Sequence, residues 1–139
     1  MDHIFLFVSS KDCKTIFPGN NPAGFTVQLP RLLNLKGNWI CALTEIYLDN
    51  KIVGTPKQVT VSTDLIEESY IRDTQLPVLR RIPVETNKDI EFTFSNPYYL
   101  KVVQNQVHRI HLNLRDRDLQ PIQFSSGELS CVLHLKHIV

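Results

Sequence analysis

The feature that most constrains the fold is the spacing of apolar residues, which recur at every second position in short runs and rarely at helical spacing. In one such run Ile90, Phe92 and Phe94 alternate with Glu91 and Thr93, a pattern typical of a strand with one buried face. Eight prolines and many Gly, Asn and Asp turns leave few windows that could hold a helix of ten residues. We therefore expect an all-β chain, with at most a helical turn near residues 64–69 or 32–35.

Turn signals such as Lys36-Gly37-Asn38 and Ser95-Asn96-Pro97 separate the apolar runs. The runs cover residues 4–8, 25–29, 39–48, 59–63, 77–84, 90–94, 98–103, 107–114 and 129–135. This number of short strands predicts an eight-stranded single jelly-roll, that is, an antiparallel two-sheet sandwich. We expect one domain over residues 1–139, with an N-terminal arm and first strand in 1–24 and the jelly-roll core in 25–136.

Two of the runs, residues 4–8 and 39–48, are apolar on both faces. A two-sheet sandwich has no third layer, so such a strand needs cover from a loop, from a terminal arm or from another chain. If another chain supplies the cover, these runs provide candidate subunit-interface residues. The candidates are Ile4, Phe5, Leu6, Phe7, Trp39 and Tyr47.

An arginine pair, Arg80 and Arg81, lies in a run bounded by Pro77 and Pro83, and prolines confine a strand to a sheet edge. Because strand residues alternate, one arginine must share the apolar face of Ile82 unless a bulge turns it away. It is then either satisfied within its own chain or paired with a carboxylate of a neighbouring subunit. On the second interpretation both arginines join the candidate interface.

Charge and cysteine content exclude several classes of function. Fifteen Lys and Arg against fourteen Asp and Glu leave a net charge of +1, which provides no basic surplus for nucleic acid. The three cysteines are odd in number and far apart, which favours a reduced, intracellular setting and provides no zinc motif. Residues 4–8 are too few for a secretory signal or a membrane span. We expect no specific nucleic-acid partner and no membrane partner.

Residues that carry catalytic chemistry are present only in patterns that have simpler explanations. His108 and His111, like His134 and His137, are three apart, and on a strand such residues point to opposite faces. Asp116 and Asp118 are interleaved with arginines, which favours a turn over a calcium site. Adjacent Glu67 and Glu68 have no catalytic partner nearby in the sequence, and neither a nucleophile elbow nor a phosphate loop occurs. The sequence predicts no enzyme, no metal and no cofactor.

Three stretches followed by a characteristic ending carry a resemblance to a known family. They are Phe25 to Pro30, then Trp39 to Ile46 with its ALTEI segment, then Asn96 to Val103, and finally the ending NLRDRDLQPIQFSSGELSCVLHLK. Their order resembles the single jelly-roll penton, or minor capsid, proteins of Polinton/Maverick elements, adintoviruses and adomaviruses, and more remotely those of virophages and adenoviruses. The resemblance covers residues 25–136.

The resemblance implies a structural capsid protein that forms a homopentamer at icosahedral vertices and contacts the major capsid protein. It also implies location in the virion, after synthesis in the cytosol and assembly in the host nucleus or cytoplasm. Many relatives carry a second, outward domain between strands, for which 139 residues leave no space, so receptor attachment is not implied. Residues 4–8, as an arm on a neighbouring subunit, and residues 39–48 are the segments expected to make the contact.

Two alternatives of other classes stay open at this point. One is a lectin- or cytokine-like β-sandwich that binds its ligand on end loops, although such modules usually carry disulfides, signals or calcium loops. The other is a cupin-like enzyme, which needs histidines pointing into the sandwich. The long strands expected over 107–114 and 129–135 provide only His108 for that role.

Overall fold

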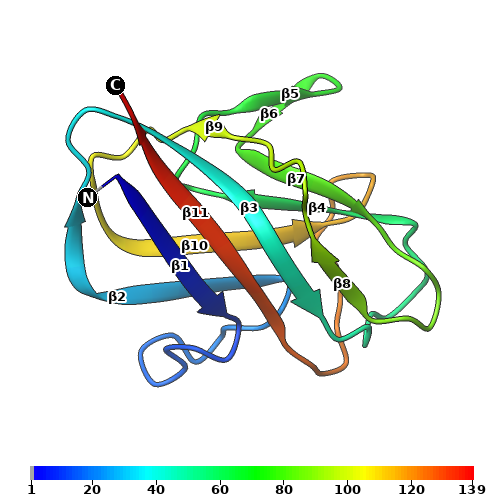
Figure 1. Cartoon of the computed structure of the whole chain (residues 1–139). Coiled ribbons are helices and arrows are strands. Elements are labelled where there is room, and N and C mark those ends of the chain that lie inside the picture. The colour runs from blue at the N-terminus through cyan, green and yellow to red at the C-terminus, as the bar shows by residue number, and fades with distance from the viewer. Residues whose placement is uncertain (1) are drawn as a thin grey trace.

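The computed structural model describes residues 2–139, and these contain eleven strands and no helix. Two antiparallel sheets form the body of the molecule (Figure 1). The first has the order β1-β11-β3-β8 and is called sheet A, with the short β9 also paired to β3; the second has the order β2-β10-β4-β7 and is called sheet B. The strands of sheet A are β1 (His3–Ser9), β11 (Leu129–Ile138), β3 (Asn38–Leu48), β8 (Ile90–Thr93) and β9 (Leu100–Lys101). Those of sheet B are β2 (Gly24–Asn34), β10 (Gln106–Arg115), β4 (Gln58–Thr63) and β7 (Val78–Pro83).

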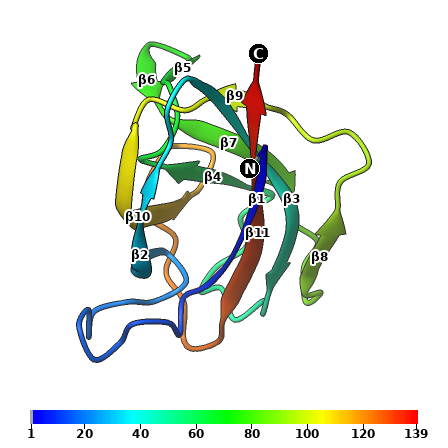
Figure 2. The same cartoon turned by 60° about the vertical axis from the view of Figure 1, so that its left-hand side comes forward.

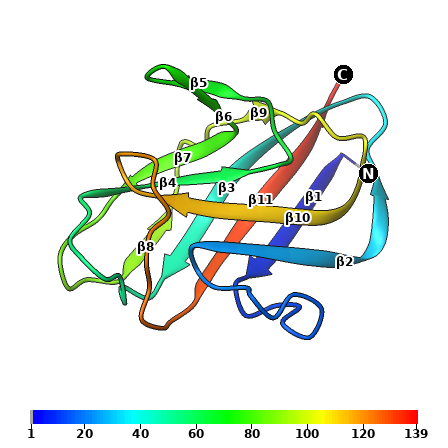
Figure 3. The same ribbon diagram turned by 180° about the vertical axis from the view of Figure 1, so that it is seen from behind.

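The connectivity is that of a jelly roll, so the expected fold is confirmed. Apart from the short β5, β6 and β9, eight strands remain. In chain order, the first, third, sixth and eighth of these form sheet A, and the others form sheet B. Figure 2 shows the sheets as separate layers, and Figure 3 shows sheet B lying across sheet A. The facing sides of the layers bury one continuous apolar core. Its largest fully buried side chains include Phe25, Leu43, Leu48, Ile110 and Leu133.

Some local expectations were wrong. No helical turn forms at 32–35, where β2 continues to Asn34, or at 64–69. The strand expected over 98–103 is reduced to the two residues of β9. A hairpin of β5 (Ser69–Ile71) and β6 (Thr74–Leu76) was not expected; it pairs only with itself and projects from the sandwich (Figure 1).

A β-bulge in β3 explains in part why this strand appears apolar on both faces. The pairing with β11 passes from Glu45 opposite Val132 to Leu43 opposite Leu133, so Thr44 is an extra residue. The extra residue changes which positions face the core: odd-numbered residues face it before the bulge, and even-numbered residues face it after the bulge. Its inward residues are Trp39, Cys41 and Leu43 before the bulge and Ile46 and Leu48 after it. Ile40 and Ala42 remain on the outer face, where Ala42 is fully buried and Ile40 half-buried within this chain, so the cover of this strand does not require another chain.

A second irregularity concerns the histidine on which the cupin-like alternative depends. The pairing of β10 with β2 shifts between Val107 and Arg109. Val107 and Ile110 are both buried although they are three residues apart, and His108 between them is exposed. The expected inward position of His108 was therefore wrong.

None of the described residues forms a helix that could cross a membrane.

Candidate assembly surface

The outer face of sheet A is the side turned away from the core, and its β1 edge carries the most exposed aromatic side chains of this face. Within residues 4–8, Ile4 and Leu6 pack against the core, whereas Phe5 and Phe7 point outward and are 55% and 73% exposed. The run lies in the chain's own sheet, paired along its length with β11. Only Phe5, Phe7 and the free edge of β1 are available to a partner.

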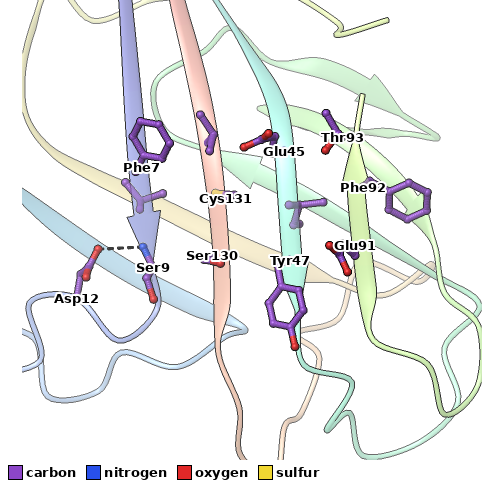
Figure 4. A pocket seen from close by; sticks show the side chains of 13 residues that line it. Phe7, Ser9, Asp12, Glu45, Tyr47, Glu91, Phe92, Thr93, Ser130 and Cys131 are labelled. Carbon is purple, nitrogen blue, oxygen red and sulfur yellow. Dashed lines mark hydrogen bonds between the residues drawn. The ribbon is translucent and has the colours of Figure 1, made fainter. Parts of the chain in front are cut away.

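A shallow depression of about 450 Å³ crosses the outer face of sheet A over β1, β11, β3 and β8 (Figure 4). Phe7 and Val132 provide apolar walls, and Glu45, Tyr47 and Glu91 provide polar ones. This mixture of aromatic and carboxylate groups on an open surface suits contact with another surface better than capture of a small molecule.

The Cys131 thiol beside this depression is not expected to be reactive. Cys131 is one of its lining residues but is buried. Burial raises the pKa of the Cys131 thiol, and likewise that of Cys41, to about 12. Since the thiolate is the reactive form, neither cysteine is suited to act as a nucleophile at neutral pH.

A cluster of rings attaches β1 to the sheet beside the depression. His134 is buried on the outer face, where the ring of Phe5 stacks on it at 4.5 Å between centroids. Its Nε2 lies 2.9 Å from Nδ1 of His3, and its Nδ1 lies 2.8 Å from the Tyr99 hydroxyl. Burial, then the nearby His3 and Lys136, lower the pKa of His134. His134 is therefore a satisfied structural histidine.

Tyr47 lies on the outer face near the end of β3, where its hydroxyl donates to Asp49 at 2.8 Å and lies 3.3 Å from a carboxylate oxygen of Asp89. The hydrogen bond to Asp49 is the main cause that raises the pKa of Tyr47 to about 12. The same bond, followed by one from the Glu128 N–H, lowers the pKa of Asp49. Tyr47 is thus already bound within its own chain, with part of its ring left on the surface.

The remaining predicted interface residues lie elsewhere. Trp39 is 7% exposed, belongs to the core and donates from Nε1 to the Lys36 carbonyl at 2.9 Å. It therefore has little surface left for a partner. Arg80 and Arg81 lie on β7, at the edge of sheet B opposite β2.

Arg80 is satisfied within the chain. Its guanidinium lies 3.8 Å from the ring centroid of Phe94 and 3.9 Å from that of Tyr98, and it donates to the Asn96 carbonyl at 2.9 Å. Because Phe94 follows β8 of sheet A, this contact closes the side of the sandwich between the two sheets. Arg81 is exposed, and no ion pair joins it to another of residues 2–139.

Sequence reasoning missed the residues of this surface that come from β8 and β11, namely Glu91, Phe92 and Val132. Nothing in their local sequence identifies them, because only the strand order of sheet A places them around the same depression as Phe7; the Phe92 side chain belongs to the inner face at the edge of β8. No group of three His, Cys, Asp or Glu side chains in the described part of the chain is arranged to hold a metal ion.

Similarity of this chain to known proteins is found among solved structures. No protein-family model matches the chain, and no curated protein matches it. Among solved structures, the crystal structure of the selenomethionine-labelled mavirus penton protein matches with a TM-score of 0.67 and 9% sequence identity. The match covers 98% of this chain and 100% of the mavirus chain. The chain is therefore similar, over nearly its whole length, to the fold of a viral penton protein.

Proposed function

We propose that the chain is a structural capsid protein, a penton or minor capsid subunit that associates with copies of itself and contacts the major capsid protein. The observation that carries this proposal is the shared jelly-roll fold with the mavirus penton protein, which spans both chains almost end to end. The resemblance in the sequence, over residues 25–136, points to the same family of small DNA viruses and Polinton-like elements.

In its finer form the proposal is a homopentamer at the icosahedral vertices of a virion. A ring of five is a closed heterologous arrangement, in which one side of each subunit meets the opposite side of the next. A stable contact of this kind buries about 800 Å² on each partner. Phe5 and Phe7 on one side of sheet A are suitable anchors, since aromatic residues dominate the energy of such contacts. The role requires no catalysis and no cofactor.

The experiment is a measurement of particle mass in solution, combined with negative-stain imaging. We expect five-membered rings of the purified protein, or rings that form when the major capsid protein is added. A protein that stays monomeric at every concentration and does not bind the major capsid protein would contradict the proposal. Specific binding of a glycan or receptor by that monomer would instead favour the lectin- or cytokine-like alternative.

A further inference from the structure

The free edge of β1 presents backbone groups without partners. Ser10 N–H donates to the Leu129 carbonyl and His137 N–H to the Asp2 carbonyl, so even-numbered residues face β11. The N–H of Ser9 instead points away from β11, to Asp12. By the alternation of an antiparallel ladder, the N–H and C=O of Phe5 and Phe7 also point outward. No loop or side chain among residues 2–139 is hydrogen-bonded to them.

The other end of sheet A has a matching edge on β8. Phe94 N–H donates to the Thr44 carbonyl of β3, and the pairing continues regularly from Thr93 to Ile90. Ile90 and Phe92 therefore face β3 with their backbone groups, whereas Glu91 and Thr93 turn theirs outward. Each edge thus offers residues whose backbone groups are directed away from the sheet, among them Phe5 and Phe7 on β1 and Glu91 and Thr93 on β8.

The two edges have the strand directions and the side-chain alternation that antiparallel pairing requires. Successive strands of sheet A are antiparallel, so β8 runs opposite to β1. On both edges, the residues with outward backbone groups carry side chains on the outer face: Phe5 and Phe7 on β1, and Glu91 and Thr93 on β8. Joining the edges would therefore keep the inner face of one sheet continuous with the inner face of the next.

Side-chain shapes agree as well. A depression of about 440 Å³ lies along the free edge of β1, between it and β2, and its apolar lining includes Leu6, Val8, Val27 and Leu29. Phe92 is an inner-face residue on β8, is 36% exposed and projects beyond the edge of its strand (Figure 4). Its ring fits the role of a knob for this depression.

The edges of sheet B are less open. On β2, Asn20 bonds both the N–H and the C=O of Thr26, and the Cys13 thiol lies against the N–H and C=O of Gln28. On β7, Pro83 has no N–H to offer and Arg80 is held between two rings. Prolines and covering loops are the usual means by which proteins protect sheet edges from pairing. The segment His3–Ser9 contains no proline, lysine or acidic residue.

We propose that the free edge of β1 in one copy pairs antiparallel with the free edge of β8 in a second copy, with Phe92 of the second copy seated between β1 and β2 of the first. The pairing places Phe5 opposite Thr93 and Phe7 opposite Glu91. It repeats from copy to copy with strand directions preserved, as a closed ring requires. This inference rests on the proposed function, because it identifies the contact through which the subunits associate.

Charge supports the same partner. The exposed Lys11 and Lys14 follow β1, and the exposed Asp89 and Glu91 lie at the start of β8. In the antiparallel pairing the end of β1 meets the start of β8, so the lysines of one copy approach the carboxylates of the next. Opposite charges at the margin of a contact favour the correct register.

Disulfide trapping tests the pairing. In a Cys13→Ser background, the double variant Phe7→Cys with Glu91→Cys places two cysteines in a hydrogen-bonded antiparallel pair, whose Cα atoms lie about 5.5 Å apart. That separation is within the range of disulfides, about 4.4–6.8 Å. We expect oxidation to yield a ladder of covalent oligomers that ends at the closed ring. Phe5→Cys with Thr93→Cys is a second pair in the same register.

The control is Phe7→Cys with Thr93→Cys, in which the two cysteines are diagonal neighbours about 7–8 Å apart and should link poorly. Covalent dimers from Phe7→Cys alone would indicate two-fold pairing of β1 with β1 and overturn the proposal. Rings of the unmodified protein without trapping of either matched pair would also overturn it, while leaving the proposed function intact. A protein that never associates would contradict both.

The knob has its own test. Phe92→Ala should raise the dissociation constant of the ring about tenfold or more, the effect expected of a buried aromatic anchor. Tyr70→Ala is the matched control, since Tyr70 is 78% exposed on the β5–β6 hairpin, away from both edges. Equal dissociation constants for the Phe92→Ala variant and the unmodified ring would show that the ring is held elsewhere.

Discussion

Arg80 is a charged residue at a strand position whose neighbours on the same face are apolar. Its backbone lies in β7 opposite Val61, whose side chain is in the core. Its long side chain reaches the open side of the sandwich, where two aromatic faces and a carbonyl receive the guanidinium. The aliphatic stem can stay among apolar groups while the charge remains near water. The sequence offered this outcome as one of two alternatives.

We predict that Arg80→Ala lowers the free energy of unfolding by about 1–2 kcal/mol, because it removes a stacked cation and one hydrogen bond. Urea denaturation followed by circular dichroism measures the change. Arg81→Ala is the matched control, and the exposed position should give a change within about 0.5 kcal/mol. Equal losses from the two variants would argue against a bridging role for Arg80.

The three thiols should differ in reactivity. Cys41 and Cys131 are buried, and burial raises the pKa of each to about 12, whereas Cys13 is partly exposed. We predict that a thiol reagent labels only Cys13 in the native protein and all three cysteines after unfolding. Mass spectrometry of the labelled peptides identifies the sites. Rapid labelling of Cys131 in the native protein would show that the thiol is accessible to the reagent through the outer-face depression.

At the scale of elements, the pattern of short apolar runs between turn residues located the eight longer strands, several of which show a clear period of two. It missed β5 and β6, since three residues are too few to display a period. It also misread β3, because Thr44 is acceptable both as a regular strand residue and as a bulge, and the pairing with β11 decides between them. Phe5 and Phe7 were identified as candidate contact residues from their own run. Glu91 and Phe92 were not, since which strands end a sheet depends on the whole topology.

Deletion of Thr44 should be far more damaging than its substitution. Without the extra residue, either Ile46 and Leu48 or Cys41 and Leu43 must turn away from the core. We expect a loss exceeding about 4 kcal/mol in the free energy of unfolding, and no folded protein if the native state is less stable than that. Thr44→Ala removes only a hydrogen bond to the Val132 carbonyl and should cost about 1 kcal/mol. Solubility and thermal unfolding distinguish the two variants.

The attachment of β1 should weaken in acid. The pKa of His134 is lowered in the folded chain, so the unfolded chain binds its proton more readily. The stability that neutral His134 contributes is fully present above the unfolded pKa of about 6.5 and is lost as the pH falls through the lower folded value. Burial is the main cause of the lowered pKa of His134, and the neighbouring His3, whose ring is hydrogen-bonded to His134, is a further cause.

We therefore predict that the midpoint of thermal unfolding falls more between pH 7 and pH 5 in the unmodified protein than in His134→Gln. Hydrogen exchange should show this loss first at the amides of Ile4 and Leu6, which pair with β11. The same pH dependence in His134→Gln would assign it to another group.

At the scale of the whole molecule, the exposed aromatic residues on β1 should matter for association and not for folding. Phe7→Ser should change the free energy of unfolding of the isolated subunit by less than about 0.5 kcal/mol, because the ring is already 73% exposed. It should raise the dissociation constant of the assembly about tenfold or more. Val53→Ser, at a loop residue that is 58% exposed, is the control. Association unaffected by Phe7→Ser would exclude Phe7 as a contact residue.

The place of β11 in sheet A fixes when this protein can finish folding during its synthesis. β11 lies between β1 and β3 in the sheet, although it follows all the other described strands along the chain. Until residues 129–138 have been made, β1 has no partner in its own sheet. Pairing of the first strand with the last is a contact of high sequence separation, and folds dominated by such contacts form in milliseconds to seconds. The edge that β1 offers to a neighbouring copy therefore forms only after residues 129–138 have been made and have paired with β1.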